Sequence, residues 1–327
     1  MNSRRVALGV AMLVTFLWST SWVLIKLGLD ELELGPLSFA GLRYVLGALI
    51  LLPLALPALH RAEPWRGGRR LLGNVVVLGL LVYSLTQGAQ FAALAFLPAV
   101  AVALVLSTTP LLVALLSRRD EPASRLQAVG VGALVVGAAL YFAPFELGDG
   151  GALGLAIALV GMVGNALAAL LGRRLARDSA EQLGGVLSLT ALSMLVGSLV
   201  LLGSGLIVEG LPSLAPEAWL IVGWLAVVNT ALAFTLWNQT LRTLTAVESS
   251  VMNNLMLVQI AILAWVFLGE ALTIVEIAGL GLAFAGILTV QLAPWLRSRR
   301  MAADLAAASG SGSAEAALSA PSGGRER

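Results

Sequence analysis

The chain contains no cysteine and only one histidine, His60. The absence of cysteine excludes a disulfide framework, thiolate metal sites and a cysteine nucleophile. A single histidine cannot supply the histidine cluster that many metal sites use. We therefore expect no metal and no cofactor.

Charged residues are also scarce, because they make up 12% of the chain, whereas a soluble domain has about 25%. Hydrophobic residues make up 59%, and the mean hydropathy is +0.93. Too little polar surface remains to cover a water-exposed globule, which excludes an ordinary soluble enzyme. The net charge of +2 gives no indication of a nucleic-acid partner.

Long apolar segments follow one another along the chain. A helix needs about 20 mostly apolar residues to cross about 30 Å of hydrocarbon. Ten segments qualify, at residues 6–28, 36–59, 71–94, 99–116, 126–142, 152–172, 183–208, 218–236, 251–268 and 274–296. The sequence thus predicts an all-α integral membrane protein with ten transmembrane helices. Residues 298–327 are rich in Ala, Gly and Ser and are predicted to form a disordered cytoplasmic tail.

The positions of the basic residues predict the orientation of the helices. All lysines and arginines except Lys26 and Arg43 fall at the termini or in alternate loops. Membrane proteins concentrate these residues on the cytoplasmic side, so both termini are expected to be cytoplasmic. The preference for Arg over Lys, with abundant Ala, Leu and Gly, is typical of GC-rich bacterial genomes. This composition favours the bacterial inner (plasma) membrane, with a multi-pass topology.

The two halves of the chain share one pattern. A single constant offset aligns three polar pairs, which are Thr86 with Thr235, Gln90 with Gln239 and Glu121 with Glu270. The same offset aligns the G-x-G-x(4)-G spacing of the fifth span with that of the tenth. We interpret residues 1–143 and 150–297 as two five-helix repeats. Because five is odd, the second repeat enters the membrane inverted, as in alternating-access transporters.

Several short motifs resemble one known superfamily, the drug/metabolite transporters of EamA type. The matching residues are FLWSTSWVLIK at 16–26, Pro36, Arg43, Pro110 and LGEALT at 268–273, together with the Gly-rich fifth and tenth spans. The resemblance implies a ten-helix carrier of small organic solutes, often an exporter, and the chain looks most like the YddG-type aromatic amino-acid exporters. Family members commonly have proline in the ninth helix where this chain has Gln259, which puts a kink there in doubt.

Arg43 is a candidate binding residue because of its depth. It lies seven residues past Pro36, or about 10 Å below the outer surface at 1.5 Å per residue. A cation at this depth is costly and usually faces a cavity or a partner. Two alternatives remain open: an ion pair with Glu270, or attraction of an anionic group such as a substrate carboxylate. Lys26 lies near its helix end, where snorkelling explains it.

The other candidates are amides and aromatic residues within the spans. Lipid cannot satisfy an amide dipole, so these side chains are expected to face the bundle interior. There they either hydrogen-bond between helices or contact a solute. Asn253 and Asn254 point about 100° apart on one helix, so only one of them is expected to line a cavity. The predicted substrate-binding residues are Trp18, Trp22, Arg43, Tyr83, Gln87, Gln90, Asn165, Gln239, Asn253 and Gln259.

These observations predict a secondary transporter that exports small organic solutes, with aromatic or other apolar amino acids favoured. The alternatives are a drug or metabolite exporter of the same superfamily and, in a different class, an intramembrane lipid-modifying enzyme. Expected partners are the small-molecule substrate and membrane lipid, and a monomer is compatible with the sequence. No acid lies at the middle of the first eight spans, so we expect no obligatory proton exchange.

Overall fold

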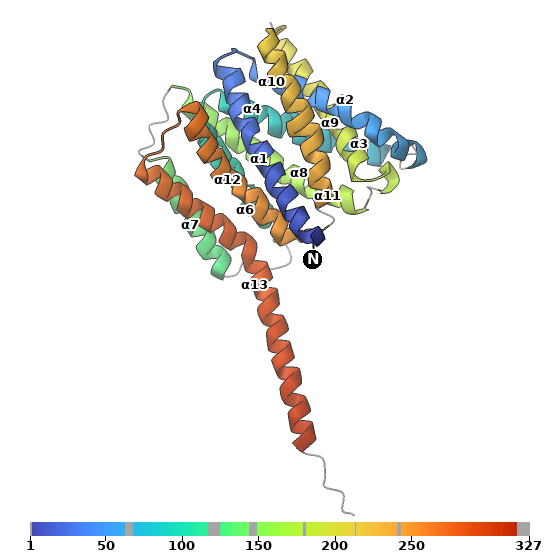
Figure 1. Ribbon diagram of the computed structural model, residues 1–327, viewed down its shortest axis with the longest axis vertical. Helices are drawn as coiled ribbons and strands as arrows, with labels where there is room; N and C mark the ends of the chain where they lie inside the picture. The colour runs from blue at the N-terminus through green and yellow to red at the C-terminus, as the bar shows by residue number, and fades with distance from the viewer. Residues whose placement is uncertain are drawn as a thin grey trace, which may run out of the picture.

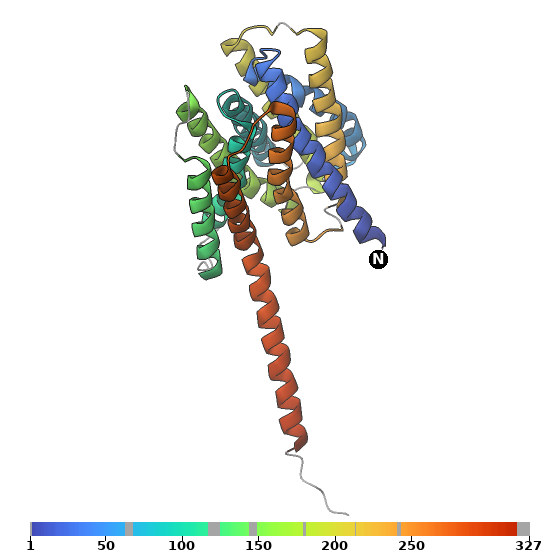
Figure 2. The same ribbon diagram turned by 60° about the vertical axis from the view of Figure 1, so that its left-hand side comes forward.

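The computed structural model describes residues 2–62, 68–116, 125–143, 149–178, 181–212, 214–240 and 243–318. Within these ranges all regular secondary structure is helical, as predicted, and the helices form one bundle from which the end of α13 projects (Figures 1 and 2). The α-helices are α1 (Asn2–Asp30), α2 (Pro36–Ala62), α3 (Gly68–Gly79), α4 (Gly88–Leu94), α5 (Ala99–Ser107), α6 (Thr109–Leu116), α7 (Arg125–Tyr141), α8 (Gly151–Asp178), α9 (Val186–Val208), α10 (Pro216–Ala226), α11 (Ala233–Thr240), α12 (Ala246–Leu268) and α13 (Ile274–Leu318). The remaining helical turns are the π-helical segments η2 (Leu80–Gln87) and η4 (Val227–Leu232) and the short 3-10 helix η3 (Glu181–Leu183).

The helices account for all ten predicted spans. Eight helical stretches are long and apolar enough to cross a membrane, including Gly68–Leu94, formed by α3, η2 and α4, and Pro216–Thr240, formed by α10, η4 and α11. Two shorter apolar helices, Ala99–Val113 and Arg125–Tyr141, correspond to the fourth and fifth predicted spans. The chain is therefore a multi-pass membrane protein.

Proline interrupts the fourth span between α5 and α6. Pro110 has no backbone N–H, so the carbonyl four residues earlier, on Leu106, loses its helical donor. The Thr109 hydroxyl donates to this carbonyl at 2.6 Å, and the Thr108 hydroxyl donates to the Val105 carbonyl at 2.7 Å. The two hydroxyls thus satisfy backbone oxygens that lipid could not satisfy.

Two other spans contain a π-helical segment, in which the hydrogen-bonded turn is one residue wider than in an α-helix. In η4, the carbonyl of Asn229 accepts a hydrogen bond from the Trp18 indole N–H at 3.1 Å. In η2, the Ser84 hydroxyl donates to the Gly197 carbonyl of α9 at 2.7 Å. Both segments therefore attach a distorted span to a neighbouring helix.

Long helix pairs hold the bundle together. α2 packs along α9, and α7 packs along α13. α1 packs against α11 and α12, while α8 packs against η2, α4, α5 and α6. The α7–α13 contact depends on glycine: a Cβ atom added to Gly137 would lie 2.6 Å from the Gly279 carbonyl oxygen, and one added to Gly286 would lie 2.6 Å from the Gly130 carbonyl oxygen. Such close approach allows helix association by packing alone, which is how helices associate in lipid.

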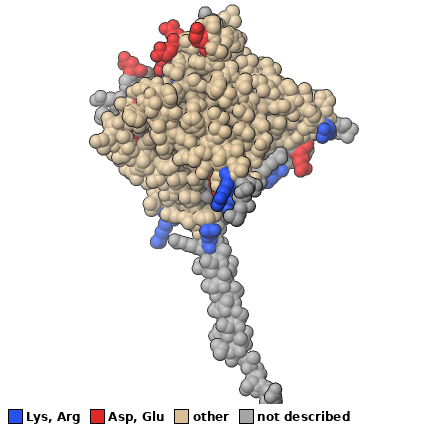
Figure 3. All heavy atoms as spheres, in the orientation of Figure 1, with Lys and Arg blue, Asp and Glu red and all other residues tan. Residues whose placement is uncertain are grey.

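Most acidic residues gather at one end of the bundle, and most basic residues lie toward the other (Figure 3). We call the end with the α1–α2 loop, which carries Asp30, Glu31 and Glu33, the acidic end. We call the end with the α1 N-terminus, which carries Arg4 and Arg5, the basic end. The N-terminus and the projecting end of α13 lie at the basic end (Figure 1). Glu121 and residues 319–327 lie outside the described residues.

The C-terminal segment differs from the expectation of a disordered tail. α13 continues as a helix past Ser298 to Leu318. Alanine is the strongest helix former, and the alanine-rich composition of this segment favours continuation of the helix that precedes it.

The glycine contacts give a stability prediction with a control in the same helix. We expect Gly137→Ala to lower the thermal unfolding midpoint in detergent, because overpacking costs about 1–3 kcal/mol. Gly132→Ala should leave the midpoint unchanged or raise it, because nothing lies within 4 Å of the added Cβ and alanine favours helix. Equal effects of the two substitutions would contradict this account of the α7–α13 contact.

Candidate solute-binding cavity

A cavity of about 390 Å³ lies between the two halves of the bundle. The volume falls within the range of small-molecule sites. Its wall comes from α1, α2, η2, α4, α5, α6, α8, α11 and α12. The lining residues are Trp18, Ser21, Trp22, Arg43, Tyr44, Gln87, Gln90, Ala103, Leu106, Ser107, Thr109, Pro110, Asn165, Ala169, Phe234, Asn253, Asn254, Met256, Leu257 and Ile260. Most of them lie well inside the spans, so the cavity is at membrane depth, while Asn253 and Asn254 lie near the start of theirs.

Arg43 is the only charged residue among the described residues that line the cavity. The arginine is 3% exposed, and its Nε donates to the Thr230 hydroxyl of η4 at 3.1 Å. The guanidinium carbon also lies 4.9 Å from the centre of the Tyr44 ring and 5.9 Å from that of Phe91. The aromatic faces and one hydroxyl thus stabilise the cation in place of a carboxylate.

The alternative of an Arg43–Glu270 ion pair is wrong. The Glu270 carboxylate instead accepts a hydrogen bond from the Ala99 backbone N–H at 2.8 Å, at the start of α5. The first N–H groups of a helix have no partner within the helix, and a carboxylate satisfies them well. The same arrangement recurs at α2, where Glu209 accepts from the N–H groups of Leu37 and Ser38, both at 2.8 Å.

Amide side chains line much of the polar wall. Gln87 accepts a hydrogen bond from the Tyr44 hydroxyl at 2.6 Å, and Gln90, which is 8% exposed, lies one turn further along the same span. Asn165 donates to the Thr109 hydroxyl at 3.2 Å. Asn253 and Asn254 both line the cavity, so the expectation that only one would do so is wrong. The cavity wall covers enough of the α12 circumference to include both.

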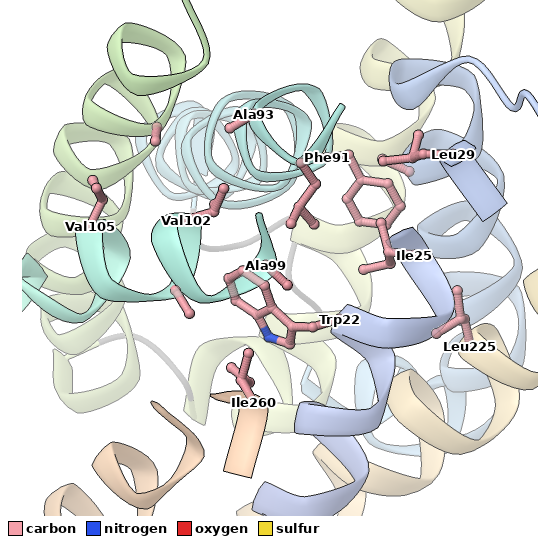
Figure 4. Close-up of a cluster of buried hydrophobic side chains, with 14 of the residues drawn as sticks. Trp22, Ile25, Leu29, Phe91, Ala93, Ala99, Val102, Val105, Leu225 and Ile260 are labelled. Atoms are coloured by element: carbon pink, nitrogen blue, oxygen red, sulfur yellow. The ribbon is translucent and has the colours of Figure 1, made fainter. Parts of the chain in front are cut away.

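The apolar wall is aromatic. The Trp18 ring centre lies 5.4 Å from that of Phe234 and 5.2 Å from that of Trp237, in edge and tilted geometries. These arrangements are the ones that aromatic quadrupoles favour. Trp22 lies beside Ala99 and Ile260 (Figure 4). The cavity therefore presents the aromatic side chains of Trp18, Trp22 and Phe234 as well as its amides.

Three predicted binding residues lie outside the cavity lining. Tyr83 is buried behind it, with its ring centre 5.3 Å from that of Tyr44. Gln239 is exposed on α11. Gln259 accepts a hydrogen bond from the Ser19 hydroxyl at 3.0 Å and so joins α12 to α1. α12 runs unbroken from Ala246 to Leu268, as the absence of proline at Gln259 allows.

Sequence reasoning missed the lining residues Tyr44 and Thr109, and it left Asn254 out of the predicted binding residues. Tyr44 follows Arg43 directly, and Thr109 precedes Pro110, so each adjoins a residue that is unusual within a membrane span. Hydroxyls next to a buried cation and next to a helix-breaking proline were therefore the available signals.

Buried apolar side chains separate the cavity from the acidic end. Ile25, Phe39 and Phe91 are fully buried, and Phe91 and Ile25 lie close together in Figure 4. The Phe39 and Phe91 ring centres are 5.3 Å apart in edge geometry. Beyond this layer, Lys26 donates to the Leu94 carbonyl at 2.8 Å and pairs with Asp30 at 3.3 Å. Toward the basic end, by contrast, the lining residue Asn253 is exposed.

The start of α12 is held by a charged cap at the basic end. Thr245 and Glu248 form a capping box, and Arg4 Nε donates to Glu248 at 2.8 Å. The backbone N–H of Thr245, and then Arg4, lower the pKa of the Glu248 carboxyl. The cap positions the helix that carries Asn253 and Asn254.

This lowered pKa gives a pH prediction. A carboxyl with a lowered folded-state pKa contributes stability above its unfolded pKa and loses it as the pH falls through the lowered value. The difference in unfolding midpoint between the parent protein and Glu248→Gln should therefore be full at neutral pH and vanish in acid. Arg4→Ala should reduce the difference. A difference that grows on acidification would contradict the assignment of this cap.

A membrane-spanning helical bundle with a polar and aromatic cavity at the middle of its spans is typical of secondary transporters. The chain belongs to the EamA-like transporter family, whose model matches residues 5–143 and again residues 152–292.

The chain is also similar to two curated proteins and to one solved structure over most of its length. The chain is 24% identical over 290 residues to the uncharacterized inner membrane transporter YedA of Escherichia coli strain K12, and the match covers 88% of this chain and 91% of that protein. The YedA protein of Escherichia coli O157:H7 matches equally well. A solved structure described only as the crystal structure of a protein shares the fold, with a TM-score of 0.58 and 21% identity over 88% of this chain and 98% of the other.

Proposed function

We propose that this chain exports small organic solutes from the bacterial cell, with aromatic or other apolar amino acids as substrates. The observation that carries the proposal is the cavity itself, because it combines Arg43, a set of amides and an aromatic wall at membrane depth. Arg43 fits a substrate carboxylate, the amides fit further polar groups, and Trp18 with Phe234 fits an apolar side chain. Its relatives named as inner membrane transporters support the same membrane for this chain.

The proposed mechanism is alternating access between two inverted five-helix repeats. The family model matches once in each half. The helix packing supports the repeat. In the first half α1 packs against α11 and α12 of the second half, and in the second half the equivalent helix α8 packs against the equivalent helices α4 and α5–α6 of the first. An exchange of the halves leaves the α2–α9 and α7–α13 pairs unchanged.

The orientation follows from the segregated charge. The basic end would face the cytoplasm by the positive-inside rule. The buried layer of Ile25, Phe39 and Phe91 would then close the outer side, while exposed Asn253 lies on the inner side. In this orientation the present conformation is the one that takes up solute from the cytoplasm.

The role of the amides is testable with a pair of glutamines at equivalent repeat positions. We expect Gln90→Ala to raise the apparent KM for phenylalanine flux into proteoliposomes about tenfold or more, because a hydrogen bond to a charged group contributes about 1.5–3 kcal/mol. Gln239→Ala should leave the KM unchanged, because this side chain is exposed and outside the cavity. Flux that is insensitive to Gln90→Ala would remove the cavity as the binding site.

Energy coupling gives a second prediction for the same vesicles. Among the described residues that line the cavity there is no aspartate or glutamate, and a proton-coupled carrier normally needs a titratable intramembrane carboxylate. Phenylalanine flux down its own gradient should therefore keep its initial rate when an ionophore dissipates the pH gradient. Strict dependence of flux on a pH gradient would contradict facilitated efflux.

A further inference from the structure

The charge of the cavity is not balanced. Arg43 contributes one positive charge, and the described lining contains no carboxylate to neutralise it. Only Nε of the guanidinium has a hydrogen-bond partner among the described residues, the Thr230 hydroxyl. The two terminal nitrogens are left available at a cavity wall. A buried cation without a counter-ion is costly, and an anion that binds beside it removes that cost.

Donors gather around this cation. The Tyr44 hydroxyl donates to the Gln87 carbonyl oxygen, so the Gln87 amide N–H groups remain free to donate. Gln90 lies one turn away and has no hydrogen-bond partner in the described part of the chain. Phe91, next to Gln90, lies within 5.9 Å of the guanidinium carbon. Arg43, Gln87 and Gln90 all line the same cavity, and their available N–H groups are donors, which matches the acceptor-only chemistry of a carboxylate.

The far side of the cavity offers no matching charge for an ammonium group. Its polar groups are the amides Asn165, Asn253 and Asn254 and the hydroxyls of Ser107 and Thr109. A bound zwitterion would leave the net positive charge of the cavity unchanged. A bound monoanion would cancel it.

We propose that the cavity recognises organic monoanions, in which one carboxylate is carried by an aromatic or apolar body and the α-amino group is dispensable. This inference rests on the proposed function, because it names the charge class of the solute at the same site. Amino acids bind through their carboxylate, and the corresponding 2-oxo or aryl carboxylates bind more tightly because they neutralise Arg43.

The charge of the solute decides how its export can be driven. Export of a monoanion moves one negative charge outward, and a membrane potential that is negative inside drives this movement without any proton. One elementary charge across 100 mV corresponds to about 2.3 kcal/mol, or an accumulation ratio of about 50-fold. The potential thus supplies a driving force that a cavity without acids does not otherwise have. Zwitterion transport, in contrast, moves no net charge and gains nothing from the potential.

Competition measures the charge preference. Proteoliposomes that contain the full chain are given labelled phenylalanine with unlabelled phenylpyruvate, phenylalanine or phenethylamine. Phenylpyruvate should compete better than phenylalanine, and about tenfold or more better than phenethylamine, which lacks the carboxylate. Arg43→Gln should abolish the preference, Arg43→Lys should keep part of it, and Gln239→Ala should keep all of it.

An imposed potential measures the moved charge. A potassium gradient with valinomycin sets the potential in vesicles without a pH gradient. Labelled phenylpyruvate should accumulate on the positive side and reverse when the gradient is reversed, while phenylalanine distribution should not respond. Protein-free vesicles measure passive leakage, and the Arg43→Gln protein should not exceed them.

Two results would overturn the inference. One is phenylalanine flux that depends on Gln90 but is not inhibited by phenylpyruvate, and in that case the proposed amino-acid exporter survives without anion selectivity. The other is phenylpyruvate flux that ignores the potential. If phenylalanine flux is itself insensitive to Gln90→Ala, the binding site of the proposed function fails first.

Discussion

The structure depends on one constraint, which is that hydrocarbon can neither hydrogen-bond a backbone group nor solvate a charge. Carboxylates at the acidic end accordingly accept from helix N-termini: Glu209 from α2 and Glu270 from α5. Near the same end, Lys26 donates to the Leu94 carbonyl and pairs with Asp30. Arg43 is the exception, because it is buried at membrane depth and its contacts in the described part of the chain are a hydroxyl and aromatic faces, without a carboxylate. A charge left in this position needs a partner that the described cavity wall does not contain, and a bound solute can be that partner.

The cavity forms where the spans depart from regular α-helix. The π-helical segment η2 ends at Gln87, η4 contains Thr230, and the fourth span breaks at Thr108 beside Pro110. Each departure frees or displaces backbone groups, and side chains around the cavity form hydrogen bonds with them. The Trp18 indole N–H, for example, donates to the Asn229 carbonyl. The distortions therefore serve two purposes. They open space between helices that would otherwise pack closely, and they fix the orientation of the residues that line it.

The spans could be predicted from sequence because length and apolarity alone decide whether a helix crosses a membrane. The lining could be predicted only in part. Amides and aromatic residues within the spans, such as Gln90 and Trp18, were expected to face the interior, but the interior includes helix contacts as well as the cavity. Gln259 satisfies its amide against Ser19 instead. A π-helical turn also shifts the rotational phase of every residue after it, and no motif in the sequence locates it. Gln90 and Gln239 each follow such a segment, yet Gln90 lines the cavity and its repeat partner Gln239 is exposed.

Arg43, the one cation among the described residues that line the cavity, makes the two halves unequal, although their helices pack in equivalent pairs. Arg43 lies on α2, close to the layer of Phe39 and Phe91 that separates the cavity from the acidic end. In the proposed cycle a solute that enters from the basic end reaches Arg43 at the far side of its path, next to the layer that must open for release. Opening that layer exposes an arginine that is now neutralised. A carboxylate bound at Arg43 therefore lowers the electrostatic cost of the closed conformation that the proposed cycle passes through, in which water reaches the arginine from neither side.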